Sequence, residues 1–229
     1  FDSHLGLTRV FGGFSWTQYA DTWDLSGPPA GSNASIGFTQ IANSNTPTSI
    51  RSHALSPLPT SGALLFGGQT STGPNTLTYT LNGTTWTTQF PPFSPVPRTE
   101  HTLLLDPTRQ NNLLFGGKNP LGTPLADTWT WANNQWNLIS TPTAPPARSG
   151  HRMAFDRNAN LGLLFGGENA TGTALNDFWS WNGTTWTQRN PANSPSPRFP
   201  GAMAFDSARG KVVMFGGSDA TYATNYSDT

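Results

Sequence analysis

The chain of 229 residues carries no net charge, because 12 Lys and Arg balance 12 Asp and Glu, and only 10% of its residues are charged. Without a basic run it is a poor nucleic-acid binder, and without roughly 18 consecutive apolar residues it has no expected membrane span. It also has no cysteine and only four histidines, which excludes disulfides, thiolate chemistry and a rich metal site. The 24 Gly and 20 Pro interrupt every window long enough for a helix, so the composition predicts an all-β protein.

A repeated motif divides the chain. The triplet Phe-Gly-Gly recurs with spacings of 55, 49, 50 and 50 residues, beginning at Phe11, Phe66, Phe115, Phe165 and Phe215. A period near 50 residues made of short strands is typical of repeat units that pack on their neighbours. We predict a single domain over residues 1–229, with units at about 1–46, 47–95, 96–145, 146–195 and an incomplete 196–229.

Within a unit the sequence predicts four strands. The first is apolar and ends at an Asp that starts a polar turn, as at Asp206. The second leads into Phe-Gly-Gly, where the glycines permit the backbone conformation that ends the strand. The third carries Trp on one face, as in Trp179 and Trp181, and Asn182-Gly183 then predicts a hairpin to a fourth strand with Trp186.

The units differ along the chain. Phe1-Asp2 matches Phe205-Asp206, so the chain starts inside a first strand, and the second unit has Pro57 where the others have Asp. The third and fourth units are regular. Asp228-Thr229 matches Asp21-Thr22, so the fifth unit stops one residue before the Trp of its third strand. A ring needs whole units to leave no open edge, so we expect a fragment of a larger propeller, or closure through another copy.

These motifs resemble a kelch repeat in the form common in bacterial secreted proteins: Pro197-Arg198, an apolar strand to Asp206, Phe215-Gly216-Gly217, and the Trp residues of the outer strands. The resemblance covers the whole chain. It implies a kelch-type β-propeller of four-stranded antiparallel blades, similar to the central domain of galactose oxidase, in which the first strand of each blade lines a central channel.

Most acidic residues occupy repeat positions. Four lie in the first hairpin turn (Asp2, Asp106, Asp156, Asp206) and four precede the third strand (Asp21, Asp127, Asp177, Asp228). An acid that recurs in every unit favours a role in a turn or in holding a blade together. Only Asp24, Glu100, Glu168 and Asp219 remain for acid–base chemistry, so we predict no catalytic residue.

Arginine and histidine recur as well. Arg98, Arg148 and Arg198 are spaced by 50 residues, and His101 and His151 follow their arginines by three. One interpretation is structural, with each guanidinium bonding carbonyls or carboxylates of the adjacent blade. The other is a ring of Arg and His around the channel mouth, suited to an anionic or carbohydrate ligand. Metal binding is not expected, because one His per blade keeps the imidazoles apart.

In an up-and-down blade the loop after the second strand and the connection before the first lie on one face, which we call the loop face. Variation between units concentrates there, as expected where a scaffold displays function. We predict that this face binds a protein or glycan partner through Arg98, Glu100, His101, Arg148, His151, Arg198, Lys118, Glu168 and Trp16.

The leading functional prediction is a non-catalytic propeller without cofactor or metal, acting as an extracellular protein-binding or surface-structural module. The Thr-, Ser- and Asn-rich, Lys-poor sequence suits secretion. The copper chemistry of galactose oxidase is excluded because its site needs a Tyr crosslinked to Cys. Three alternatives remain open: a carbohydrate-binding lectin, a sugar isomerase or mutarotase on the Arg and His face, and self-association that completes the propeller.

Overall fold

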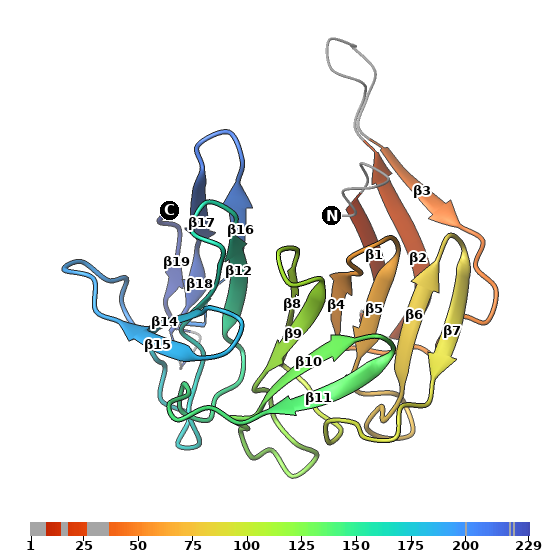
Figure 1. Ribbon diagram of the computed structural model, residues 1–229, viewed down its shortest axis with the longest axis horizontal. Helices are drawn as coiled ribbons and strands as arrows, with labels where there is room; N and C mark the ends of the chain where they lie inside the picture. Colours follow the sequence, from red (N-terminus) through yellow and green to blue (C-terminus); the bar gives the residue numbers. More distant parts are fainter. Residues whose placement is uncertain (1–7, 15–17, 27–36, 200, 220, 222) are drawn as a thin grey trace.

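The computed structural model describes residues 8–14, 18–26, 37–199, 201–219, 221 and 223–229. All regular structure in these residues is β-strand, and the units follow one another in an arc (Figure 1). The prediction of an all-β propeller with four-stranded antiparallel blades is confirmed. The first strand expected at Phe1-Asp2 lies outside the described residues.

The sheets follow the repeat. The first has three described strands: β1 (Thr8–Phe14), β2 (Gln18–Ser26) and β3 (Gly37–Ile41). The next three are complete four-stranded blades. The second blade consists of β4 (Ala54–Pro57), β5 (Ala63–Phe66), β6 (Thr78–Asn82) and β7 (Thr85–Gln89), and the third of β8 (Thr102–Asp106), β9 (Asn111–Phe115), β10 (Thr128–Ala132) and β11 (Gln135–Ile139). The fourth blade consists of β12 (Arg152–Asp156), β13 (Leu161–Phe165), β14 (Phe178–Trp181) and β15 (Trp186–Arg189). The last unit has two ladders: β16 (Ala202–Asp206) with β17 (Lys211–Phe215), and β18 (Gly217–Ser218) with β19 (Asn225–Tyr226).

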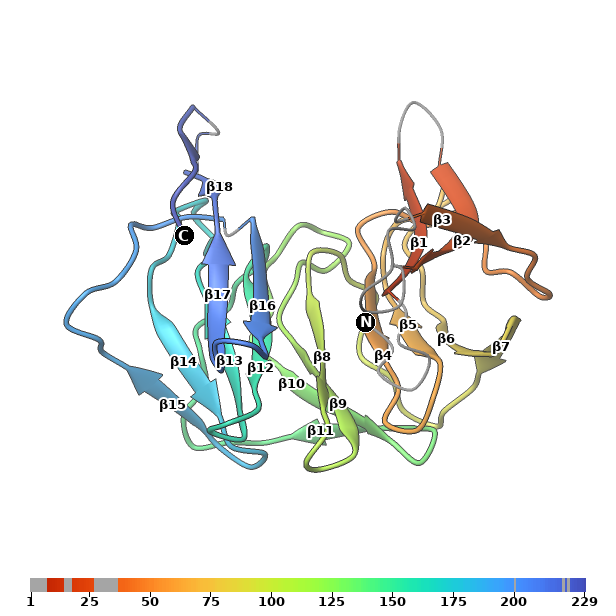
Figure 2. The ribbon, with the colours of Figure 1, turned by 90° about the horizontal axis from the view of Figure 1, so that it is seen from above.

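The first strands of successive units face the centre. β4 packs against β8, β8 against β12 and β12 against β16, while β7, β11 and β15 form the outer rim (Figure 1). The first and last sheets stand at opposite ends of the arc (Figure 2), and no sheet in the described residues joins them. The described chain holds no helix long and apolar enough to cross a membrane.

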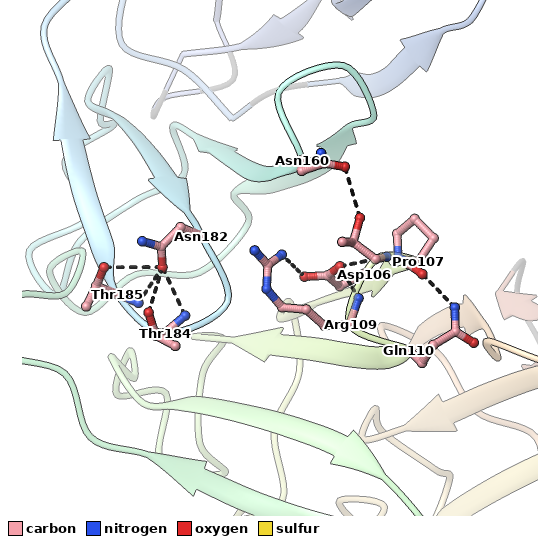
Figure 3. Close-up of polar contacts among 9 residues, drawn as sticks. Asp106, Pro107, Arg109, Gln110, Asn160, Asn182, Thr184 and Thr185 are labelled. Carbon is pink, nitrogen blue, oxygen red and sulfur yellow. Dashed lines mark hydrogen bonds and ion pairs between the residues drawn. The ribbon is translucent and has the colours of Figure 1, made fainter.

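The recurring Asp of the first hairpin closes its turn, as predicted. Asp106 Oδ1 accepts the backbone N–H groups of Thr108 (3.1 Å) and Arg109 (3.0 Å), while Oδ2 pairs with the Arg109 guanidinium at 2.6 Å (Figure 3). Asp156 and Asp206 repeat the backbone bonds. The side chain of Asn182 similarly closes the hairpin before β15, accepting the N–H groups of Thr184 and Thr185 (Figure 3).

The recurring Asp before the third strand holds the blade together through the recurring Arg. Arg148 is fully buried and donates to both oxygens of Asp177, at 2.6 and 2.5 Å. It also donates to the carbonyls of Gly166 (3.2 Å) and Pro146 (3.0 Å), so one guanidinium ties the ends of three chain segments in its own unit. Burial alone would raise the pKa of Asp177, but the hydrogen bond from Arg148 outweighs it and the pKa is lowered.

Arg98 and Arg198 repeat this arrangement with Asp127 and Asp228. The expectation that the guanidinium reaches the adjacent blade is therefore wrong. It is the arginine backbone that reaches across, because the carbonyls of Arg98 and Arg148 accept the N–H groups of Gly68 (2.7 Å) and Gly117 (2.9 Å) in the preceding unit.

The Phe of each of the first three triplets packs at the joint with the next unit. Phe115 meets the ring of Trp186 at 5.2 Å and the ring of His151 at 5.6 Å, both from the next unit. Phe66 meets Trp136 and His101 in the same way. The indoles also bond across the joint: Trp136 Nε1 donates to Thr78 Oγ1 and Trp186 Nε1 to Thr128 Oγ1, each at 2.9 Å.

The joint between the first and second units lacks that indole bond. Trp86 packs on Phe11 at 5.0 Å and is fully buried, yet its Nε1 has no hydrogen-bond partner in the described chain. Thr22 occupies the position of Thr78 and Thr128, but its hydroxyl accepts a hydrogen bond from the side-chain amide of Asn43.

Removing the buried arginine should be costly. Arg148→Leu is expected to lower the free energy of unfolding by about 3–5 kcal/mol, because it leaves Asp177 with an unpaired charge. Denaturant titration measures this, and Arg157→Leu at an exposed position is the matched control, with a change below about 0.5 kcal/mol. The double variant Arg148→Leu, Asp177→Leu should recover part of the loss. A loss equal to that of the control would contradict the role given to Arg148.

Stability should also fall on mild acidification. Burial, reinforced by Arg98, lowers the pKa of His101 to about 3, and burial together with Arg148 lowers the pKa of His151 well below its usual value. The unfolded chain therefore binds protons below about pH 6.5 that the folded chain does not, and each histidine removes about 1.4 kcal/mol per pH unit there. Denaturant midpoints at about pH 7 and about pH 5 test this. His101→Gln with His151→Gln should flatten the slope, whereas an unchanged slope would assign it to other groups.

Candidate functional site

The loop face is built as predicted. The residue after each arginine position forms an antiparallel bridge with the residue after each Phe-Gly-Gly: Thr99 with Lys118, Ser149 with Glu168, and Phe199 with Ser218. The backbone bonds are short, with Thr99 N–H donating to Lys118 O at 2.9 Å and Lys118 N–H donating back at 2.8 Å. These bridges bring the two sets of loops onto one face of the propeller.

The same bridges align the second unit. Arg51 pairs with Gln69, so Arg51 is equivalent to Thr99 and not to Arg98. Ile50, which is fully buried, therefore takes the arginine position, and His53 is equivalent to His101. Spacing from Phe66 hides this equivalence because the segment between the paired residues Pro57 and Ala63 is one residue shorter than the equivalent segment between Leu105 and Asn112.

A hollow of about 450 Å³ lies in this face, lined by residues of four units: Ser52, His53, Glu100, His101, Gly150, Arg152 and Phe199. This is large enough for a side chain or a small ligand. Because the lining comes from four units, its shape depends on how the blades are set around the centre.

The rim of the hollow is formed by three residues from successive units whose backbones have the left-handed conformation, with positive φ. Ser52 (φ 55°), Glu100 (φ 57°) and Gly150 (φ 66°) occupy equivalent positions. Their backbones are joined, since Glu100 N–H donates to Ser52 O at 3.3 Å and Gly150 N–H donates to Glu100 O at 3.0 Å. A long acidic side chain at such a backbone conformation carries a strain cost that glycine avoids. The fold therefore does not require a glutamate at position 100, where the equivalent residues of other units are Ser52 and Gly150.

Charges next to the rim form a cluster across two units. Lys118 lies between two carboxylates, 3.3 Å from Glu100 Oε2 and in direct contact with Glu168. Partial burial disfavours the ammonium, but the two glutamates outweigh it, so the pKa of Lys118 is raised. Ser149 Oγ also donates to Glu168 at 3.3 Å. Of the three side chains, Glu100 is the most open, at 41% exposed.

Arg152 brings a second cation to the hollow. It opens β12, where the other first strands have Ala54, Thr102 and Ala202. Its Nη1 donates to the carbonyl of His151 at 3.1 Å, which fixes one side of the guanidinium. Burial lowers the pKa of Arg152, and the charge of Glu100 works in the opposite direction.

Phe199 supplies an aromatic surface. A Cβ at Gly150 would come within 2.8 Å of its ring, so the ring lies directly against the glycine backbone. Phe199 occupies the position that Arg51, Thr99 and Ser149 hold in the other units. The hollow thus combines a carboxylate, a guanidinium, an aromatic face and two histidines.

The predicted site residues divide into two groups. Glu100, His101, Lys118 and Glu168 come together at the hollow and its rim. Arg98, Arg148 and Arg198 are buried with their donors engaged, and His151 is fully buried, so these four lie beneath the face. Trp16 lies outside the described residues. Among the described residues, no three His, Asp or Glu side chains are grouped to hold a metal.

Sequence reasoning missed Arg152 and Phe199. Both break the repeat at positions where other units carry small or polar residues; the 50-residue spacing aligns these positions in the last three units, and the register of the bridges adds the second unit. Departure from the repeat is the signal that could have found them.

Comparisons with known proteins agree with this architecture. The solved structure titled "Structure of YjhT" superposes with a TM-score of 0.67 at 13% identity, over 86% of this chain, which spans 66% of that structure's length. This likeness shows the fold alone. A search of curated proteins gave no match. The family described as KLHDC2/KLHL20/DRC7 Kelch-repeats domain matches residues 113–229, just over half of the chain. The chain therefore belongs to the kelch-repeat family.

Proposed function

We propose that this chain is a protein-binding kelch module that holds its partner on the loop face, with the hollow at the centre of the contact. The observation that carries the proposal is that residues departing from the repeat converge there. Glu100, Arg152 and Phe199 each replace a small or polar residue of the other units, and all three line the hollow. Since the kelch framework does not need them, a partner is the simplest physical reason for their presence.

The chemistry of the hollow indicates the kind of contact. Glu100 and Arg152 oppose each other in charge, and the histidine at its base is neutral because burial lowers the pKa of His101 to about 3. A partner segment that offers both a donor and an acceptor beside an apolar group fits such a wall. The same wall would suit a hydroxyl-rich sugar, so a glycan is the second candidate.

A selection experiment tests this function. A random-peptide display library is panned against the immobilised chain, and enriched peptides are measured again on Glu100→Gly, Arg152→Ala, Phe199→Ser. Each change installs the residue that another unit carries at that position, so the fold is expected to survive. We expect at least a tenfold loss of affinity, because the three side chains supply the charge and ring contacts.

Arg157→Glu, an exposed change in the turn after β12 that also carries Asn160 (Figure 3), is the control and should bind as the parent does. Equal binding by the triple variant would remove the hollow from the contact. Hits on a glycan array that are lost in the triple variant, without any enriched peptide, would favour the sugar.

Glu100→Gly alone should change the free energy of unfolding by less than about 1 kcal/mol in a denaturant titration, since relief of backbone strain offsets the loss of the ion pair with Lys118.

We further propose that the module works outside the cell. Only two lysines in 229 residues, in a sequence rich in Thr, Ser and Asn, support an extracellular setting. An antibody against the chain, applied to fractions of the source organism, should find it in the medium or on the cell surface. External protease should remove the surface pool from intact cells while a cytosolic marker survives. Recovery only with that marker would overturn the assignment.

A further inference from the structure

One inter-unit connection displays two aromatic rings to solvent. Residues 90–97 link β7 to β8, and Phe90 and Phe93 within them are 82% and 74% exposed. Val96 is half-exposed as well. Isolated exposed apolar residues are common, but three on one short segment mark an interaction site.

The repeat shows that this display is specific to one connection. Counting back from Arg148 and Arg198 as from Arg98, Ser140 and Asn190 take the position of Phe90, while Thr143 and Asn193 take that of Phe93. All four alternatives are polar and exposed. The connection therefore folds with polar residues at these positions, and the two rings are not required for packing.

The segment is held in place at its far end. Pro95 is buried, Arg98 is buried, and Arg98 Nε donates to the carbonyl of Val96 at 3.1 Å. Four of the eight residues are proline, which fixes φ and restricts the residue before it. Apart from a bend at Pro92 and Phe93, the segment is thus extended and loses little conformational entropy on binding.

Its hydrogen-bonding pattern is one-sided. Proline has no N–H, so Pro91, Pro92 and Pro95 offer only carbonyl acceptors. None of the carbonyls of residues 91–95 accepts a hydrogen bond in the described chain. The segment also carries no charge. A complementary surface must supply N–H or O–H donors together with flat apolar faces, and tryptophan and tyrosine supply both.

We propose that residues 90–97 are a second interaction site, a preformed proline-rich ligand that docks Phe90 and Phe93 into a Trp- and Tyr-lined groove of another protein. The site is independent of the hollow on the loop face. None of its residues lines the hollow, so both contacts can be made at once.

A panel of purified WW, SH3 and EVH1 domains probes this groove chemistry, with binding to the whole chain measured by biolayer interferometry. At least one domain class should bind, and Phe90→Asn with Phe93→Asn should weaken it at least tenfold. This variant copies Asn190 and Asn193 of the chain itself, so its thermal unfolding should match the parent. The triple variant of the hollow should bind the panel as the parent does.

A transplant provides the matched control. Asn190→Phe with Asn193→Phe in the parent should create a second site and double the number of domains bound per chain. Three results would overturn the proposal: no domain binds, binding survives in the Phe90 and Phe93 variant, or the parent self-associates in sedimentation while that variant does not. The last would assign the two rings to a contact between copies.

Discussion

In each of the last three units one arginine belongs to two blades at once, and the propeller depends on it. The guanidinium of Arg148 binds Asp177 and two carbonyls inside its own blade, while its backbone carbonyl accepts the N–H of Gly117 in the blade before. A Cβ at Gly116 would lie 2.7 Å from that carbonyl, so only glycine permits the approach. The same arginine therefore fixes how the segments of its own blade are held together and how closely the preceding blade approaches.

This coupling explains the composition. A blade held by a buried charge pair needs few other charges, and the recurring acids are consumed by turns and arginines. Aromatic rings then make side-chain contacts between neighbouring blades, as where Phe115 packs against Trp186 and His151 of the next unit. What remains free to vary is the loop face and the outer connections. Both proposed interaction sites lie in those two places, and both consist of residues that differ from their counterparts in neighbouring units.

Much of the fold could be predicted because turns and triplets are local signals. The Asp106 turn and the hairpin closed by Asn182 follow from side chains that bond backbone two or three residues away. The partner of Arg98 could not be predicted, since Asp127 is 29 residues distant and spacing alone fits the adjacent blade equally well. Only part of the candidate site could be predicted from the sequence. Glu100 and Lys118 stood outside the repeat, whereas Arg152 became a candidate only when the structure placed it in the lining of the hollow, at the first-strand position held by Ala54 and Ala202 in other units.

The unpaired indole of Trp86 has a consequence for how the molecule opens. The next two joints each gain a hydrogen bond between a Trp and a Thr, and the first joint buries the same donor without a partner in the described chain, which costs about 1–3 kcal/mol. In an array whose units touch only their neighbours, opening begins at the weakest joint. Of these three joints the first should therefore open before the other two, exchanging the amide hydrogens of β2 and β3 while β9 and β10 remain protected.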